Sequence, residues 1–363
     1  MKLLFKTLIL LLCFPALVMA SDGDGKFKGK YTKEKTVNKE FTVNPNAGLE
    51  VSNMYGNIDI VTWNENRTVF EVHIKANGND EAKVQEKLNE IRIEFTKNSS
   101  LVTANTRFSE KTKWNSWWGK DNKKVSVEVN YIIKLPVGNS VDLNNDYGAI
   151  SLNELDGNAN ISCDYGQLNI GELRGENNYL NFDYTSNSTI EYMKNGKINA
   201  DYSGFTLEKV GDLELNADYT QSEVVEALDV KYDCDYGKVT IRQAEDVIGS
   251  GDYVTNRLGT ISGSVNLNTD YGSIRINRMT ATAKDVKINS NYTGIKLGFD
   301  TGYSFNFELD LSYSGFHRDE SVTVTSKSVQ NSKKQYLGYH GTKNSGNKVS
   351  INSDYGSVTF IKL

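Results

Sequence analysis

The feature that most constrains the fold is a triplet, Asp-Tyr-Gly or a close variant, that returns at short and nearly constant intervals. From residue 147 onward its tyrosines lie 18, 19, 18, 17, 17, 17, 18, 21 and 21 residues apart, and a gap of 42 residues precedes the last one. A short fixed period is typical of a solenoid, because one unit cannot bury its apolar face alone and must stack on its neighbours. The tyrosines are Tyr147, Tyr165, Tyr184, Tyr202, Tyr219, Tyr236, Tyr253, Tyr271, Tyr292, Tyr313 and Tyr355.

Apolar residues recur at a spacing of two on both sides of the tyrosines. Val141 and Leu143 precede Tyr147, and Ile150 and Leu152 follow it. This alternation predicts two short strands in each repeat, each with one face turned inward, and makes the triplet the corner between them. We therefore predict an all-β solenoid whose coils hold roughly 18 to 21 residues and stack at about 4.8 Å.

The chain begins with a stretch that resembles a secretory signal peptide. Residues 1–20 contain Lys2 and Lys6, an apolar run over residues 8–12, and small residues before position 21. The run is too short to span a bilayer, so we expect an exported protein without a transmembrane segment, located in the periplasm or at the cell surface. Removal of the peptide leaves 39 basic and 46 acidic side chains, a net charge of −7. That weak acidity argues against nucleic acid as a partner.

The remaining sequence divides into four parts. Residues 21–46 form a polar segment that we expect to be loose in its first part, and residues 47–63 form a first coil around Tyr55. Residues 64–140 interrupt the repeat with strands and a helix predicted over residues 80–95, and we interpret this α+β insert as a cap over the open solenoid end. Residues 141–363 hold the remaining repeats, including an irregular coil expected over residues 321–346, around Tyr336.

Two stretches carry a resemblance to a known family. The sequence from Val129 to Pro136, running into Val141 to Ile150, resembles the bacterial putative-adhesin family, and residues 341–360 resemble the last coil of that family. The resemblance covers nearly the whole chain after the signal peptide and implies a right-handed β-helix at the cell envelope. It supplies no catalytic or binding residues. Asn187 and Asn256 replace apolar residues of the pattern, and we expect bulges there.

Aspartates at one repeat position form the first candidate site. Stacked at about 4.8 Å, their carboxylates could bind a cation or a glycan, or each could accept the backbone N–H groups of its own turn. The second interpretation is favoured, because the period lacks the second acidic position of calcium-binding repeats. These aspartates, called the aspartate strip below, are Asp146, Asp164, Asp183, Asp201, Asp218, Asp235, Asp252 and Asp270.

The tyrosines form a second file. Facing outward, they could bind sugars, but they share parity with the inward apolar positions, so we predict an internal ladder. Cys163 and Cys234 occupy one repeat position four coils apart, a separation of roughly 19 Å that a disulfide cannot bridge. We predict two free, inward-facing thiols.

A third candidate is the loop that contains three of the four tryptophans, Trp114, Trp117 and Trp118, among several lysines. Exposed, these indoles would contact a glycan, an envelope lipid or a partner protein. Alternatively, they fold onto the cap and seal the solenoid end.

Little in the sequence indicates an enzyme. His73, His317 and His340 are scattered without metal-ligand spacing, and no catalytic triad or phosphate-binding loop is readable. The carboxylates are spread evenly, whereas an active site would concentrate them. We therefore expect a non-enzymatic, adhesin-like binding or scaffolding module of the bacterial cell envelope. It would be monomeric, without cofactor or metal, and its partner would be an envelope protein or a glycan. The alternatives are a structural or regulatory periplasmic protein that docks a membrane partner, and a polysaccharide-active β-helix enzyme.

Overall fold

The computed structural model describes residues 27–108 and 125–363. Within them one hydrogen-bonded sheet of 29 strands accompanies a single helix, which confirms the all-β prediction. The signal-peptide prediction concerns residues outside this range. No helix among the described residues is long and apolar enough to cross a membrane.

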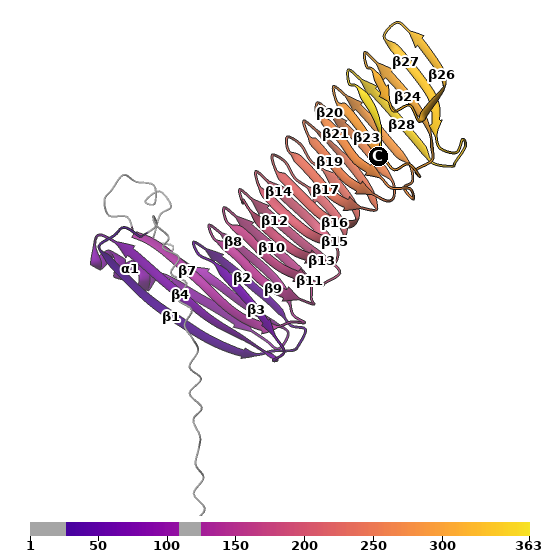
Figure 1. Cartoon of the computed structure of the whole chain (residues 1–363). Coiled ribbons are helices and arrows are strands. Elements are labelled where there is room, and N and C mark those ends of the chain that lie inside the picture. The colour runs from indigo at the N-terminus through magenta and orange to yellow at the C-terminus, as the bar shows by residue number, and fades with distance from the viewer. Residues whose placement is uncertain (1–26, 109–124) are drawn as a thin grey trace, which may run out of the picture.

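Two long parallel ladders make up most of the sheet (Figure 1). The first ladder contains the strands that lead into each tyrosine: β2 (Gly48–Met54), β8 (Ser140–Asp146), β10 (Ala159–Asp164), β12 (Asn178–Asp183), β14 (Gly196–Asp201), the later halves of β15 (Gly204–Asn216) and β16 (Gln221–Asp233), β18 (Asp246–Asp252), β20 (Val265–Asp270), β22 (Val286–Asn291), β28 (Lys348–Asp354) and β24 (Phe305–Ser312). The second ladder contains the strands that follow the tyrosines: β3 (Ile58–Trp63), β9 (Ala149–Leu155), β11 (Gln167–Leu173), β13 (Ser188–Met193), the first halves of β15 and β16, β17 (Lys238–Ala244), β19 (Thr255–Ile261), β21 (Ser273–Met279), β23 (Gly294–Phe299), β29 (Val358–Lys362) and β25 (Phe316–Arg318).

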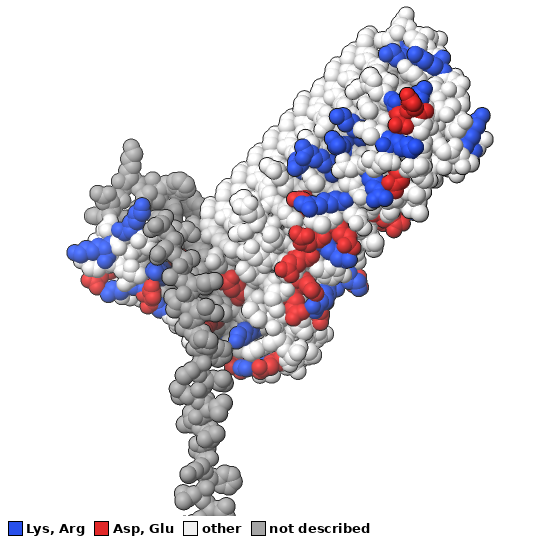
Figure 2. Space-filling view, in the orientation of Figure 1, with Lys and Arg blue, Asp and Glu red and all other residues white. Residues whose placement is uncertain are grey.

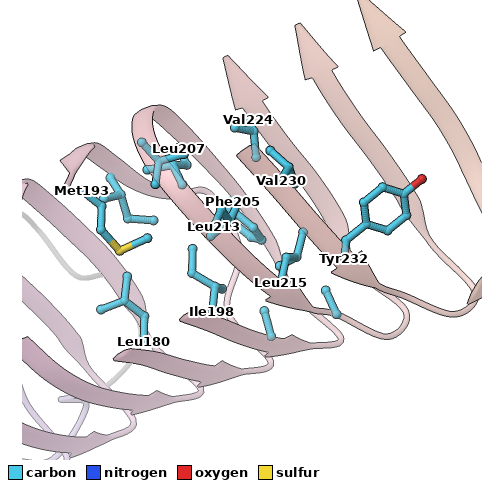
Figure 3. Close-up of a cluster of buried hydrophobic side chains, with 14 of the residues drawn as sticks. Leu180, Met193, Ile198, Phe205, Leu207, Leu213, Leu215, Val224, Val230 and Tyr232 are labelled. Carbon is cyan, nitrogen blue, oxygen red and sulfur yellow. The ribbon is translucent and has the colours of Figure 1, made fainter. Parts of the chain in front are cut away.

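The register between repeats follows the tyrosine period. Strand β10, for example, pairs in parallel with β8 on one side and with β12 on the other, so Ile161 lies between Leu143 and Leu180. Inward residues of both ladders meet in one apolar core. Figure 3 shows Leu180, Ile198 and Leu215 in one row that points into the space between the ladders. Each such fully buried side chain stabilises the fold by about 1.5–3 kcal/mol relative to exposure.

The insert and the preceding segment extend both ladders at one end. The elements are β1 (Tyr31–Thr42), β4 (Arg67–Gly78), α1 (Glu81–Glu90), β5 (Arg92–Lys97), β6 (Leu101–Arg107) and β7 (Val125–Pro136). Strand β6 pairs with β2 and antiparallel with β5, while β7 pairs with β3 and antiparallel with β4, whose other neighbour is β1. Helix α1 packs on β1, β4 and β7 with Val84 and Leu88 buried.

Two details differ from the sequence-based expectations for this end. The helix ends at Glu90, because Ile91 is extended and the apolar residues that follow it belong to β5. The Asp80 side chain caps the helix by accepting the Lys83 N–H. The polar segment 21–46 contains β1, a strand of 12 residues that follows β4 along its whole length. The strand was not predicted because its residues are mostly charged or polar and only one of its faces is half-buried.

The other end departs from a simple stack. Strands β26 (Val322–Gln330) and β27 (Lys333–His340) form an antiparallel hairpin that pairs with β24. The prediction of an irregular coil over residues 321–346 is therefore wrong. The last strands in sequence, β28 and β29, lie between earlier ones: β28 pairs with β22 and β24, and β29 with β23 and β25.

The two expected bulges have different outcomes. Asn187 has a positive φ of 57° and adds one residue before Ile190 returns to register with Ile170, so that repeat is irregular as predicted. Around Asn256 the pairing of β17, β19 and β21 continues without a shift, so the prediction of a bulge there is wrong.

Candidate functional site

The tyrosines form one continuous ladder along the outside of the molecule. Neighbouring ring centroids lie 4.7 to 5.3 Å apart with interplanar angles of 0 to 14°. All except the half-buried Tyr55 are 42 to 65% exposed. In spatial order this tyrosine ladder is Tyr55, Tyr147, Tyr165, Tyr184, Tyr202, Tyr219, Tyr236, Tyr253, Tyr271, Tyr292, Tyr355 and Tyr313.

The prediction of an internal tyrosine ladder is therefore wrong, and the backbone explains why. Every ladder tyrosine has a positive φ, between 52 and 66°, which places it in the left-handed region. Such a residue breaks the alternation of a strand, so parity no longer sets the direction of its side chain. The next residue takes the inward place instead, as the buried Thr185, Thr220 and Val254 do. At Gly148 this place is so tight that a Cβ would lie 1.9 Å from the Gly56 carbonyl oxygen.

Stacking decides which part of each ring a ligand can reach. Each inner ring is covered on both faces by its neighbours, and Phe108 packs edge-on against Tyr55 at one end of the ladder. Along its length, the ladder therefore presents ring edges and hydroxyl groups. It suits ligands that hydrogen-bond to phenols rather than sugars that stack on an aromatic face.

The phenols also influence one another. Burial against the neighbouring residues raises the pKa of Tyr219, and the adjacent Tyr202 and Tyr236 raise it further. The Tyr219 hydroxyl thus remains protonated at neutral pH and can donate a hydrogen bond.

The aspartate strip lies beside the tyrosine ladder, and its carboxylates cap the following repeat. Seven of the eight carboxylates accept the backbone N–H of the residue in register on the next strand, at 2.6 to 3.3 Å. The expectation that each aspartate caps its own turn is therefore wrong. Within the turn, the tyrosine N–H already donates to the next repeat, as Tyr147 does to the Asp164 carbonyl.

Close spacing of the carboxylates affects their ionisation. Burial raises the pKa of Asp183, and the charges of Asp164 and Asp201 raise it further against the opposing hydrogen bond from the Asp201 N–H. Burial and Asp164 likewise raise the pKa of Asp146. Within residues 27–108 and 125–363, no group of three or more His, Cys, Asp or Glu residues is arranged to hold a metal ion.

An asparagine file, which the sequence analysis did not single out, completes this face. It lies two residues before the aspartate strip on the same outward side, and its amides bond along the ladder, as Asn216 Nδ2 does to Asn199 Oδ1 at 3.1 Å. Strand alternation could have found it, because the position three before the tyrosine is outward. Its members are Asn144, Asn181, Asn199, Asn216, Asn268, Asn289 and Asn352.

The other candidates have separate outcomes. Trp114, Trp117 and Trp118 lie outside the described residues, so both interpretations of that loop stay open. Cys163 and Cys234 are free and buried, as predicted, and burial raises the pKa of each thiol to about 12.

Comparison with known proteins gives only distant structural likenesses. No protein-family model and no curated protein matches the sequence. Similar solved structures include a putative cell adhesion protein from Clostridium sporogenes, with 12% identity over 91% of this chain and 100% of that chain and a TM-score of 0.19. A putative adhesin from Bacteroides fragilis has 11% identity over 91% and 97% of the two chains and a TM-score of 0.23. A putative adhesin from Parabacteroides merdae has 9% identity over 90% and 96% and a TM-score of 0.33. All three are bacterial proteins, one titled a putative cell adhesion protein and two titled putative adhesins.

Proposed function

We propose that this chain is a non-enzymatic, adhesin-like protein of the bacterial cell envelope, exported by its signal peptide and built as a right-handed β-helix. Its proposed role is to bind or scaffold through its side. The observation that carries this proposal is the lateral face on which the asparagine file, the aspartate strip and the tyrosine ladder run next to one another for most of the length of the rod.

A repeating face favours a repeating or extended ligand. Most repeats offer a carboxylate and a phenol, and those of the asparagine file add an amide, at nearly the same place and about 4.8 Å from those of the next repeat. These are groups that hydrogen-bond to hydroxyl-rich polymers, and many weak contacts along one ligand add to a useful affinity. A glycan or an extended envelope protein is the partner that this chemistry fits.

The lateral binding proposal can be separated from docking through the tryptophan loop. The mature protein, from residue 21, would be incubated with native envelope extract, and retained partners would be quantified. One variant, Y202F/Y219F/Y236F, removes three hydroxyls but keeps the stacked rings, while a second changes Trp114, Trp117 and Trp118 to alanine. Lateral binding predicts that the phenylalanine variant loses its partner and that the tryptophan variant keeps it.

Three lysines on the first ladder provide the control. Variant K197Q/K231Q/K287Q alters the same ladder away from the tyrosines and should retain the partner. Loss of the partner only in the tryptophan variant would favour a periplasmic protein that docks a membrane partner. If the wild-type protein retained nothing, the adhesin-like proposal would be abandoned.

A groove supports one minor alternative, a polysaccharide-active enzyme. This open groove, with a volume of about 820 Å³, crosses β12 to β20 and contains Asp212, Asp229 and Asp246 in register on neighbouring strands. Burial raises the pKa of Asp229, and the charge of Asp246 adds to the effect. The same repeat position also has a structural role, because Asn195 Oδ1 accepts the Asp212 N–H and Asp246 Oδ1 accepts the Ser264 N–H. Product formation from a polysaccharide that is abolished in D229N would favour the enzyme.

A further inference from the structure

The outer face of the second ladder changes sign halfway along the rod. Its strands from β9 to the first half of β16 contain six acidic residues and one basic residue: Glu154, Glu172, Glu191, Glu208, Glu223, Glu226 and Lys209. The following strands, β17, β19, β21 and β23, contain six basic residues and no acidic one: Lys238, Arg242, Arg257, Arg275, Arg278 and Lys296. Figure 2 shows the acidic side chains gathered near the middle of the rod and basic ones beyond them.

The two halves also differ in how their charges are paired. Arg174 binds both Glu154 and Glu172, and Lys209 binds Glu226 at 2.6 Å. In the basic half, Arg242 pairs with Glu223 and Arg278 with Asp300, whereas Arg257, Arg275 and Lys296 form no ion pair with any described residue.

These three unpaired cations form a single column. Arg257 on β19 is in register with Arg275 on β21, which is in register with Lys296 on β23, and all three are exposed. Neighbouring strands lie about 4.8 Å apart, less than the screening length of about 8 Å at physiological salt. Like charges placed opposite each other across strands are destabilising. The overall charge of the chain is −5, so composition does not account for the column.

The surroundings of the column are small and polar. On one side lie Thr255, Ser273 and Gly294, also in register, and a Cβ added to Gly294 would meet no atom within 4 Å. On the other side Arg275 Nε donates a hydrogen bond to Asn277 Oδ1 at 2.8 Å. A ligand chain can therefore lie close to the sheet on the Gly294 side of the cations.

This chemistry selects among polyanions. Nucleic-acid strands are bound by aromatic side chains interleaved with cations, and the outward positions of β19, β21 and β23 carry no aromatic residue. They carry no large apolar residue that would enter a lipid surface. Instead, hydroxyl and amide groups flank the cations, as sugar hydroxyls require.

We propose that Arg257, Arg275 and Lys296 bind a linear anionic polysaccharide that carries carboxylate or sulfate groups along its length. The proposal deepens the adhesin-like function and rests on it for the choice of a glycan. It places the anion-binding surface on the second ladder, away from the asparagine file.

Native gels that contain polygalacturonate, dextran sulfate or neutral dextran provide the test, with the dissociation constant taken from the retardation of the mature protein. The wild-type protein should be retarded by at least one of the two charged polymers and not by neutral dextran, and the charged polymer that retards it identifies carboxylate or sulfate. Variant R257Q/R275Q/K296Q should bind about five- to thirtyfold more weakly, since three exposed charge contacts together are worth roughly 1–2 kcal/mol. Variant K197Q/K231Q/K287Q has the same change in net charge on the other ladder and should bind like the wild type.

Three results would overturn the proposal. They are no retardation of the wild-type protein by either charged polymer, an equal loss of affinity in R257Q/R275Q/K296Q and in K197Q/K231Q/K287Q, or tighter binding of single-stranded DNA than of both polysaccharides. The two proposals can fail separately. If a charged polymer retards the wild-type protein but the protein retains no envelope partner, the adhesin-like function is refuted and polysaccharide binding by the cationic column stands. Retention of envelope partners without retardation would do the reverse.

Discussion

At the scale of residues, Asp183 shows how one side chain serves two opposing effects. Its Oδ1 accepts the Asp201 N–H at 3.1 Å, which stabilises the next repeat, while its charge lies between those of two neighbouring aspartates. Burial and those neighbours raise its pKa. A carboxyl group whose pKa is raised by folding stabilises the fold in its protonated form, and that contribution is lost as the pH rises through the folded pKa.

We therefore expect Asp183→Asn to stabilise the protein at neutral pH. The amide oxygen keeps the acceptor and removes the charge, so the free energy of unfolding at pH 7 should rise by about 0.2–1 kcal/mol. The difference should shrink below about pH 4, where the wild-type carboxyl is protonated. Urea denaturation at both pH values measures it. Asp183→Ala, which lacks the acceptor, should be destabilised at both, and an equal loss in the Asn variant would contradict the charge argument.

Tyr219 offers a second test at this scale. Its ring stacks on Tyr202 at 4.7 Å and on Tyr236 at 4.9 Å, so Tyr219→Ala removes two ring contacts. Two such contacts are worth about 1–3 kcal/mol, and Tyr219→Phe should keep nearly all of that stability. Thermal or chemical denaturation of both variants measures the effect. Similar losses in both variants would show that the hydroxyl, and not the ring, stabilises the corner.

At the scale of elements, adjacent strands share space in a way that a single repeat does not reveal. Tyr232 on β16 points into the core below Gly249 on β18, and its hydroxyl donates to Asn256 Oδ1 at 2.7 Å. A Cβ on Gly249 would lie 2.0 Å from the Tyr232 ring. The missing side chain at Gly249 and the polar Asn256 are thus both explained by one large neighbour.

This shared space predicts non-additive mutations. Gly249→Ala should destabilise the protein by about 1–3 kcal/mol through overpacking. In the Tyr232→Leu background the same change should cost at least about 1 kcal/mol less, because the ring is gone. A double-mutant cycle in denaturant measures the difference. Equal costs in the two backgrounds would mean that the ring moves aside freely.

The same elements show what the sequence could and could not predict. The strand pairs around Leu143 and Ile150 follow from alternation, because that pattern is local. The outward direction of Tyr219 could not be predicted, since it depends on a left-handed backbone that leaves no mark on spacing. Nor could the link between Tyr232 and Asn256, residues 24 apart in sequence, because it requires the register of neighbouring strands. The column of Arg257, Arg275 and Lys296 could not be predicted either, because it too depends on the register of neighbouring strands.

At the scale of the whole molecule, β28 and β29 hold the hairpin end onto the rest of the rod. Strand β28 contributes the buried Val349 and Ile351 between β22 and β24, and β29 contributes Val358 and Phe360 between β23 and β25. A mutation here affects two interfaces at once.

Deletion of residues 348–363 should therefore release the segment that contains β24 to β27. Limited proteolysis with mass spectrometry should find new cleavage sites between residues 305 and 341, while the repeats before residue 300 stay protected. The full-length protein under the same conditions is the control. Continued protection of the segment would show that β24 can dock directly on β22.

The position of β28 and β29 also bears on the order in which the rod can fold. Earlier repeats can stack one on another as the chain emerges, but β24 and β25 cannot settle in their final places until a later segment has entered between them and β22 and β23. The far end thus works as a clasp that closes only after β28 and β29 have entered between the strands that they hold together. Until then, Phe307 and Leu309 lack their neighbours Val349 and Ile351, and this apolar surface is exposed to water and to other chains.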